Sequence, residues 1–336
     1  MIRIALDAMG GDTAPRVEVE GAAQALTDLP PGFRVQLVGR TADIEAALAA
    51  TPGADRARIE IIEAPDVVGM GEKPLAAVRG KPRSSIAVGL ELQKKGKSDA
   101  FISAGNTGAV MAASTLLLRL HSGVQRAAIA APLPTARQQP LLVLDAGANV
   151  DCDAREIVGF AHLGSVYARD VLGRAEATVG LLNIGEEDEK GNAVVKEAHQ
   201  LLKQTPGIRY LGNVEGRDIP AGECRGQPLD LVVCDGFVGN VVLKFYESAA
   251  RVFVALMKRE IPDVLARPEM GKVLRVLDYA TYGGAPLLGV RGVVIICHGA
   301  SPARAIKNAI RVAVQAVRSH LSEDIAAEFA QRGVPA

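Results

Sequence analysis

Several residue types are scarce in this sequence, and each scarcity excludes a class of protein. There is no tryptophan, and aromatic residues make up only 4% of the 336 residues, which argues against surfaces that stack nucleic-acid bases. The 38 basic residues equal the 38 acidic ones, so the chain lacks the excess positive charge of a typical nucleic-acid-binding domain. We therefore expect no nucleic-acid partner, although local basic patches are compatible with a neutral total.

Cysteines and long apolar runs are also few. None of the four cysteines belongs to a C-x-x-C pair, which predicts buried free thiols in a reducing compartment rather than a disulfide scaffold. No stretch approaches the roughly 18 apolar residues of a membrane span. The first apolar run meets Asp7 too early for a signal peptide. Together these features predict a cytoplasmic protein.

Common catalytic and nucleotide-binding motifs are missing too. The sequence has neither the P-loop pattern G-x-x-x-x-G-K-[ST] nor G-x-G-x-x-G after a strand, which lowers the prospect of ATP or NAD binding. It also lacks the G-x-S-x-G elbow of hydrolases and any H-E-x-x-H or Cys/His cluster. We expect no cofactor and no metal.

Glycine, in contrast, is abundant, and its positions are informative. The 35 glycines are about a tenth of the chain, against roughly 7% in average proteins. Many follow short apolar runs that are succeeded by a helical pattern. These runs cover residues 2–6, 35–39, 59–62, 100–102, 141–144, 177–182, 229–234 and 293–297. Repeated strand, turn and helix predict an α/β fold with a mostly parallel sheet flanked by helices.

Parallel sheets bind ligands beyond the carboxyl ends of their strands, where this sequence places Gly, Asn, Asp, Ser and His. Three glycine-containing turns precede helices and could offer backbone N–H groups to an anion such as phosphate: Gly10-Gly11, Asn106-Thr107-Gly108 and Gly239-Asn240. The first of these leads to Thr13 and Pro15, which resemble a helix cap and first turn.

Two further strand ends each leave two interpretations open. His298 ends an apolar run and precedes Gly299, so it is either a site residue or a packing residue. Lys190 lies in a turn with four carboxylates, at residues 185–191. That turn is either a solvated surface loop or a place where a lysine reaches a bound anion.

Residues 251–282 differ from the rest because apolar residues at helical spacing alternate with lysines and arginines, and Pro262 and Pro268 interrupt them. This segment is either an amphipathic tip that lies on a membrane surface or a helical hairpin buried in a dimer interface. The basic excess is small, which favours the hairpin on residues alone.

The loops are recognisable as a set, because seven segments match one family in order. They are DAMGGD (7–12), SAGNTGA (103–109), LDAGAN (144–149), NIGEE (183–187), NVEG (213–216), CDGFVGNV (234–241) and YGGAPLLG (282–289), the last leading to His298-Gly299. The chain resembles the bacterial phosphate acyltransferase family PlsX (acyl-acyl-carrier-protein:phosphate acyltransferase) over nearly its whole length.

The resemblance implies a Rossmann-like α/β fold related to phosphotransacetylases and isopropylmalate dehydrogenases. It implies one unit over residues 1–336 from which an amphipathic helical segment, 251–282, protrudes. The implied reaction transfers a long fatty acyl group from acyl carrier protein to inorganic phosphate. A membrane glycerol-3-phosphate acyltransferase (PlsY-type) would then use the acyl phosphate to begin phospholipid synthesis. Family members are cytoplasmic homodimers that associate peripherally with the inner face of the cell membrane.

Site roles are expected on this basis. Phosphate is itself the nucleophile, so no activated Ser or Cys is needed, and the site must bind an anion and stabilise an oxyanion. We expect Lys190 to hold phosphate together with Gly10, Gly11, Asp12, Asn106, Thr107, Gly108 and Asn183. We expect Asn240 to stabilise the oxyanion, His298 to assist the leaving sulfur and Asp235 to orient these groups.

An acidic carrier protein requires a local basic docking face on a neutral enzyme. Two candidate sets are Arg79, Lys81 and Arg83, and the group Lys258, Arg259, Lys272 and Arg275. The apolar side chains expected to touch the acyl chain or the bilayer are Phe253, Met257, Leu265 and Leu274. Two alternatives remain: a phosphotransacetylase that uses short acyl-CoA, and a non-catalytic membrane adaptor of lipid synthesis.

Overall fold

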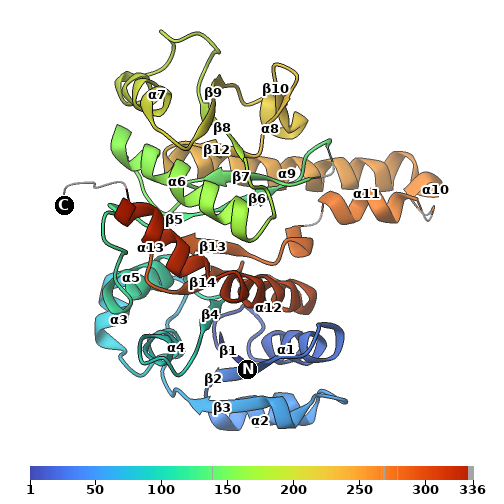
Figure 1. The fold of residues 1–336 in the computed structure, drawn as a ribbon. Coiled ribbons are helices and arrows are strands. Elements are labelled where there is room, and N and C mark those ends of the chain that lie inside the picture. Colours follow the sequence, from blue (N-terminus) through green and yellow to red (C-terminus); the bar gives the residue numbers. More distant parts are fainter. Residues whose placement is uncertain (138, 266, 268, 278, 332–336) are drawn as a thin grey trace. The chain divides into compact units, whose positions relative to one another are not determined.

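The chain divides into two compact units. The computed structural model describes residues 1–137, 139–265, 267, 269–277 and 279–331. Unit 1 consists of Met1–Ala127 with Tyr282–Ala336, and unit 2 of Ala128–Thr281. Each unit has a mostly parallel sheet covered by helices (Figure 1), as the repeated strand–turn–helix pattern predicts. The α/β fold class is therefore confirmed.

The sheet of unit 1 has β1 at its centre. Its strands follow the order β3-β2-β1-β4-β14-β13, in which all neighbours are parallel except β14 and β13. The strands are β1 (Ile2–Asp7), β2 (Phe33–Gly39), β3 (Ile59–Glu63), β4 (Ala100–Ser103), β13 (Ala285–Leu288) and β14 (Val293–Ile296). Because β1, β4 and β14 are adjacent and parallel, the loops that follow them emerge at the same edge.

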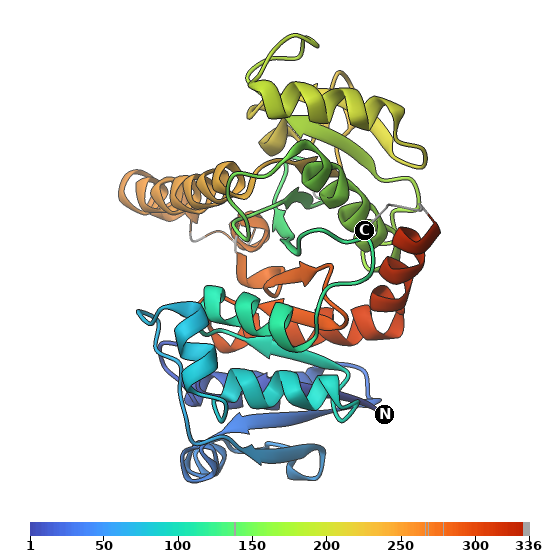
Figure 2. The same cartoon turned by 90° about the vertical axis from the view of Figure 1, so that its left-hand side faces the viewer.

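Helices cover both faces of this sheet (Figures 1 and 2). α1 packs along α12, and α12 contacts β1, β4 and β14, while α4 packs on β1, β2 and β4 beside α5. The helical elements are α1 (Arg16–Asp28), α2 (Thr41–Ala49), the 3-10 turn η1 (Arg56–Arg58), α3 (Pro74–Gly80), α4 (Ser85–Lys94), α5 (Thr107–Leu117), α12 (Ala303–Arg318) and α13 (Leu321–Gln331). The continuous apolar strands fill the core between these layers, as buried parallel strands do; Ile4, Leu6 and Phe101 are completely buried.

Unit 2 has its own sheet, with the order β6-β7-β12-β8-β9. Its neighbours are parallel except β6 and β7. The strands of the unit are β5 (Ala128–Ile129), β6 (Ala131–Leu133), β7 (Leu141–Leu144), β8 (Thr178–Leu182), β9 (Arg209–Val214), β12 (Leu231–Val233) and the small hairpin β10 (Glu223–Cys224) and β11 (Gln227–Pro228). The ends of β7, β12, β8 and β9 therefore share one edge.

Helices also cover the sheet of unit 2. α6 packs on β7 and β12 and contacts α7, whereas α9 packs on β7. Val242, Leu243 and Tyr246 of α9 lie against a buried cluster that includes Val143 and Val232. The helical elements are α6 (Ala154–Asp170), α7 (Ala193–Gln204), α8 (Asp218–Ala221), α9 (Gly236–Glu260), α10 (Pro262–Leu265), α11 (Met270–Leu277) and the turn η2 (Tyr279–Thr281). All four cysteines of the chain are free and buried, as the sequence predicts.

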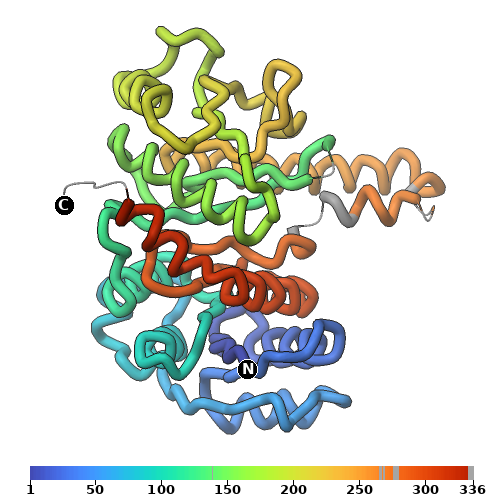
Figure 3. Tube along the Cα trace, in the orientation of Figure 1, coloured from blue at the N-terminus to red at the C-terminus, as the bar shows by residue number. Residues whose placement is uncertain are grey.

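A helical hairpin extends from unit 2. Within this unit, the far half of α9 runs past the edge of the sheet, and α10 and α11 fold back beside it, as the tube in Figure 3 traces. Pro262 begins α10, so it ends one helix and starts the next, consistent with its missing backbone N–H; Pro268 lies outside the described residues. Within the described part of the chain, no helix is both long and apolar enough to cross a membrane.

One local expectation is wrong. Thr13 is not the cap of the first helix: α1 begins at Arg16, Pro15 occupies the N-cap position, and no side chain caps this end. Proline immediately before a first turn fits the restricted φ angle that helix starts favour. The other predicted boundaries agree with the strands and helices within a few residues.

The start of α9 packs tightly against the loop after β7. A Cβ atom at Gly239 would collide with the Asp145 carbonyl oxygen and approach the Cys234 sulfur. Both neighbours are buried and the first is main chain, so neither can move aside cheaply. Gly239 therefore allows a close approach between the helix and the strand-end loop.

We expect Gly239→Ala to lower the free energy of unfolding by at least about 2 kcal/mol, because the added methyl overpacks this contact. Gly159→Ala is the matched control: Gly159 lies inside α6 with open space around its Cβ position. There the higher helix propensity of alanine should raise stability by about 0.5–1 kcal/mol. Urea unfolding of both variants measures the difference; equal effects would contradict the close-packing role of Gly239.

Candidate active site

Two strand-end clusters, one in each unit, contain most of the predicted site residues. In unit 1 the cluster is organised by Asp7, which is completely buried at the end of β1. Its Oδ1 accepts a hydrogen bond from the Met9 N–H (3.0 Å), and its Oδ2 accepts one from the Ser103 hydroxyl (2.7 Å). Ser103 in turn accepts from the Gly105 N–H (3.0 Å). This chain joins the loop after β1 to the loop after β4.

The Gly10–Asp12 loop lies against both neighbouring loops. A Cβ atom on Gly10 would lie 2.6 Å from the Gly105 nitrogen, so this approach requires glycine. The Asp12 N–H donates to the Gly299 carbonyl over 2.9 Å. Unit 1 thus brings together three segments that the sequence singled out, those around Gly10, Gly105 and Gly299.

Asn106 uses its side chain within the fold. Its Oδ1 accepts from the Ala109 N–H (3.0 Å) and caps α5, and its Nδ2 donates to the carbonyls of Met70 (2.9 Å) and Glu72 (3.2 Å). The Asn106 amide is therefore occupied. The neighbouring Thr107 and Gly108 begin α5, where backbone N–H groups and the positive end of the helix dipole favour an anion.

His298 has a defined hydrogen-bonding arrangement. Its Nδ1 accepts from the Ala300 N–H over 3.2 Å, which places the proton of the neutral ring on Nε2. The ring is partly exposed at the end of the loop after β14. The help that His298 is expected to give a leaving group stays a prediction.

Glu18 is a buried acid that the sequence gave no reason to suspect. It lies in the first turn of α1, is 1% exposed, and its Oε2 has no hydrogen-bond partner among the described residues. Burial raises its pKa to about 7, and the charge of nearby Asp7 adds to this effect, while the Gly11 N–H opposes it. Acidic residues are common in exposed first turns, which is why only the structure distinguishes this one.

In unit 2 the corresponding organiser is Asp145, completely buried after β7. Its Oδ1 accepts from the N–H groups of Ile129 (3.0 Å), Gly147 (3.2 Å) and Ala148 (3.0 Å). Its Oδ2 accepts from the backbone N–H (2.6 Å) and side-chain amide (2.9 Å) of Asn149. One carboxylate thus fixes the whole loop, although burial still raises its pKa.

Asp235 and Asn240 lie at the start of α9. Asp235 caps the helix: Oδ1 accepts from the Phe237 N–H and Oδ2 from the Cys152 N–H, both at 2.8 Å. Asn240 is exposed near the helix N-terminus, and its side chain lies against Gly147. Asp235 is therefore held as an acceptor, and Asn240 remains accessible beside the loop that Asp145 organises.

Ion pairs of two acidic residues, Glu186 and Asp188, hold the loop from Asn183 to Asn192 in place. Arg225 and Arg217 pair with Glu186 at 3.1 and 3.3 Å. Asp188 pairs with Lys203 and accepts a hydrogen bond from His199 Nε2 over 2.9 Å.

The same loop presents Lys190. The side chain of Asn183 donates to the Lys190 carbonyl over 3.1 Å, so Asn183 supports the loop from within. Asn213 of β9, which the sequence did not single out, donates to the Glu187 carbonyl over 2.9 Å. Lys190 is exposed, and it makes no ion pair within the described part of the chain. Its ammonium is available to an anion.

The predicted docking and apolar residues have mixed surroundings. Arg79 and Arg83 are exposed, but Lys81 donates to the Val67 carbonyl (2.8 Å) and pairs with Glu72 (2.5 Å). On the hairpin, Lys258, Arg259 and Lys272 are exposed, and Arg259 pairs with Glu260. Phe253 is 51% exposed, Met257 is buried and Leu274 is half-buried. The side chains of Leu265 and Arg275 lie outside the described residues.

Solved structures with the same arrangement define the class of fold. The chain is similar to a phosphotransacetylase from Streptococcus pyogenes (TM-score 0.65, 16% identity, 94% of each chain covered). It is also similar to a branched-chain phosphotransacylase from Enterococcus faecalis (TM-score 0.60, 13% identity, 94% of this chain and 99% of that one). At these identities the likeness shows the fold alone, which is an α/β fold.

Sequence comparison then identifies the family. A family model described as "Fatty acid synthesis protein" matches residues 2–324. The phosphate acyltransferase of Heliobacterium modesticaldum is 48% identical over 95% of both chains. That of Thermosynechococcus vestitus is 47% identical over 97% of this chain and 94% of the relative. The chain belongs to the phosphate acyltransferase family, as its loop motifs predict.

The buried acid of unit 1 yields a pH prediction. Because burial favours the neutral form in the fold, the contribution of Glu18 to stability is complete below its ordinary pKa of 4.5 and is lost as pH rises to about 7. The free energy of unfolding of Glu18→Gln minus that of the wild type should therefore increase by about 3 kcal/mol from pH 4.5 to 7.5.

Urea unfolding at several pH values measures this difference. Glu20→Gln, which removes a more exposed carboxylate of the same helix, is the control and should show little change with pH. If the Glu18→Gln difference stayed constant over the range, the pKa of Glu18 would be the same in the folded and unfolded states.

Proposed function

We propose that this protein transfers a long-chain fatty acyl group from acyl-acyl carrier protein to inorganic phosphate and releases acyl phosphate. Family membership supports acyl transfer to phosphate. The observation that carries the assignment of a site is the Asn183–Asn192 loop. There Arg217, Arg225 and Lys203 pair with Glu186 and Asp188, while the exposed Glu187, Glu189 and Lys190 make no ion pair with any described residue, so the Lys190 ammonium can reach an anion.

The proposed step begins with phosphate as the nucleophile. A phosphate oxygen attacks the thioester carbonyl carbon, a C–O bond forms, and the carbonyl electrons move to the oxygen. Collapse of this tetrahedral intermediate breaks the C–S bond and releases the carrier thiolate. In unit 2, Lys190 provides charge for phosphate binding; in unit 1, the backbone N–H groups around Gly10–Gly11 and at the start of α5 are a separate group of candidate donors to an anion.

The remaining residues act on charge that develops during this step. Asn240, accessible at the N-terminus of α9, donates to the oxyanion, and the helix dipole adds to the stabilisation. Asp235 orients this helix end, since both of its oxygens already accept backbone hydrogen bonds. His298 donates from Nε2 to the departing sulfur. A thiol has a pKa near 8.5, so only modest acid assistance is needed.

The product explains the proposed partners. Acyl phosphate is a reactive mixed anhydride that joins a hydrocarbon chain to a charged head, so its consumer must be an acyltransferase at a membrane. We assign that role to a PlsY-type glycerol-3-phosphate acyltransferase, which makes this reaction the first step of phospholipid synthesis. Peripheral contact of the protein with the inner face of the membrane through Phe253 and its neighbours on the α9–α11 hairpin would shorten the transfer.

We expect Lys190→Ala to raise the KM for phosphate at least tenfold, a loss of about 1.4 kcal/mol or more in binding, because the ammonium is removed from the anion site. Lys196→Ala removes an exposed lysine of α7 just beyond the same loop and should leave KM within twofold of the wild type. The assay follows phosphate-dependent release of carrier-protein thiol, with acyl phosphate trapped as the hydroxamate.

The same assay separates the alternatives. Reactions without phosphate correct for direct attack of hydroxylamine on the thioester. Turnover of short acyl-CoA in preference to palmitoyl-carrier protein would identify a phosphotransacetylase. No phosphate-dependent product from any donor would favour a non-catalytic adaptor. Equal kinetics for Lys190→Ala and the wild type would remove the phosphate role of Lys190 but leave the reaction itself in place.

The proposed homodimer is supported by an apolar stripe on α9. Five exposed side chains share one face of this helix: Phe237, Val241, Phe245, Val252 and Leu256. Such a contiguous apolar face on a surface helix is typical of a protein interface. We assign it to a second copy of the chain, consistent with the closed symmetry of most homo-oligomers.

We expect Phe245→Asp to convert the dimer to a monomer at micromolar concentration, because Phe245 is 74% exposed in the single chain and the carboxylate would be buried on pairing. Leu116→Asp, which places the same charge on an exposed leucine of α5, is the control and should remain dimeric. Sedimentation velocity measures both. A wild type that sediments as a monomer would exclude the dimer, and an unaffected Phe245→Asp dimer would place the interface elsewhere.

A further inference from the structure

Helix α12 in unit 1 has an unusual charge distribution. Its 16 residues include four basic side chains and no acidic one, although the whole chain is neutral. Ile306, Ala309 and Ile310 face the core. The basic side chains follow each other at intervals of three, four and seven residues, which places them on one face of the helix. We call Arg304, Lys307, Arg311 and Arg318 the basic stripe.

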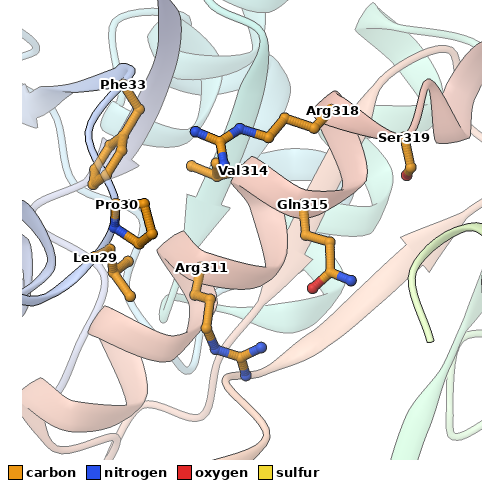
Figure 4. Close-up of a pocket in the computed structure, with 8 residues that line it drawn as sticks. All are labelled: Leu29, Pro30, Phe33, Arg311, Val314, Gln315, Arg318 and Ser319. Atoms are coloured by element: carbon orange, nitrogen blue, oxygen red, sulfur yellow. The ribbon is translucent and has the colours of Figure 1, made fainter. Parts of the chain in front are cut away.

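A pocket of about 480 Å³ lies at the C-terminal half of this stripe. Leu29, Pro30 and Phe33, from the connection between α1 and β2, form one wall, and α12 forms the other (Figure 4). Arg311 and Arg318 leave the helix at two ends of the pocket, and Gln315 lies between them (Figure 4). The pocket thus has an apolar wall and a strongly polar rim.

The rim is positively charged, and its two arginines make few hydrogen bonds with the described residues. Arg311 makes no ion pair or side-chain hydrogen bond with any described residue, and Arg318 donates only to the Pro31 carbonyl, over 3.1 Å. No acidic side chain is among the eight residues that line the pocket. The acid of the adjoining helix end, Asp28, is paired with Lys307 at 2.7 Å. Arg311 and Arg318 are therefore able to bind external anions.

The spacing indicates what kind of anion fits. Arg318 follows Arg311 at an interval of seven positions, which is about 10 Å along the helix at a rise of about 1.5 Å per residue. The complete stripe, from Arg304 to Arg318, is about 21 Å long. Carboxylates two turns apart on a partner helix have the same spacing as the two arginines, and an apolar side chain between them would reach the pocket. A small anion would cover only one end of such a surface.

The position of α12 fits a role in substrate delivery. The helix begins at Ala303, directly after the loop that contains His298 and Gly299. The pocket is at its other end, beside the amino end of β2. A partner bound along the stripe would therefore be adjacent to a candidate active-site loop without occupying it.

We infer that the basic stripe and its pocket form the docking surface for an acidic helix of the carrier protein that bears the acyl group. This inference rests on the proposed function, since it assigns the binding surface of the proposed donor. The carboxylates of the partner pair with Arg311 and Arg318, and one of its apolar side chains enters the pocket between them. Docking of this kind mainly accelerates association and weakens with salt.

The test compares a protein-bound donor with a small one. In Arg311→Glu/Arg318→Glu, the KM for palmitoyl-carrier protein should rise at least tenfold and lose most of its salt dependence. The kcat and the KM for palmitoyl-phosphopantetheine, a thioester without the protein, should stay within twofold. Lys94→Glu/Lys97→Glu, which makes the same charge change at the end of α4, is the matched control. Arg311→Ala gives a smaller rise and removes no ion pair or side-chain hydrogen bond with a described residue.

Three other outcomes of this test would overturn the docking surface. An unchanged KM for the carrier-protein donor, or an equal rise for both donors, overturns the docking surface. If the KM for palmitoyl-carrier protein rises in Arg79→Glu/Arg83→Glu but not in the α12 variant, docking is assigned to the Arg79–Arg83 segment. That result also overturns the docking surface on α12.

If the wild type uses neither donor, the proposed function fails while docking remains testable. Fluorescence anisotropy of labelled carrier protein then measures binding directly. Binding to the wild type that is lost in the α12 variant supports the surface, and binding that both share, or no binding at all, rejects it.

Discussion

Both units depend on one type of interaction: a buried aspartate at a strand end that accepts hydrogen bonds from the loops around it. Asp145 collects four backbone N–H groups and a side-chain amide from two segments of unit 2. Asp7 links the loops after β1 and β4 through Ser103. An unpaired buried carboxylate would cost several kcal/mol, so these loops are held in the one arrangement that satisfies it. The candidate site residues are presented on loops, but loops fixed by buried anchors.

Ion pairs within the fold also determine which charges are exposed. In the Asn183–Asn192 loop, the carboxylates of Glu186 and Asp188 form ion pairs with arginine and lysine side chains from later segments. Lys190 is left exposed in this loop beside Glu187 and Glu189, and none of the three makes an ion pair with a described residue. On α12 the apolar face is buried and the exposed face is cationic. A protein with equal numbers of acids and bases thus presents a positive surface on α12, where the nearby acid Asp28 is paired with Lys307.

The sequence predicts the α/β architecture well because buried parallel strands are continuous apolar runs and their polar ends are marked by Gly, Asn and Asp. For the same reason it predicts the sheet edges at which the candidate residues emerge, Lys190 and Asn240 in unit 2 and His298 in unit 1. It does not reveal that the Asn106 amide is occupied by the carbonyls of residues 69–72, since those partners are more than 30 residues away. Nor does it reveal the burial of Glu18 or the pocket beside Arg311, because each depends on packing between segments distant in the chain.

Helix α9 combines features that are otherwise separate. Asp235 caps its start, Asn240 lies in its first turns, the apolar stripe extends from Phe237 to Leu256, and its end enters the hairpin. At 25 residues it is about 37 Å long, and a continuous α-helix of this length is stiff. Asn240 and the far half therefore belong to one rigid element. Any contact that displaced the far half would also displace the candidate oxyanion donor.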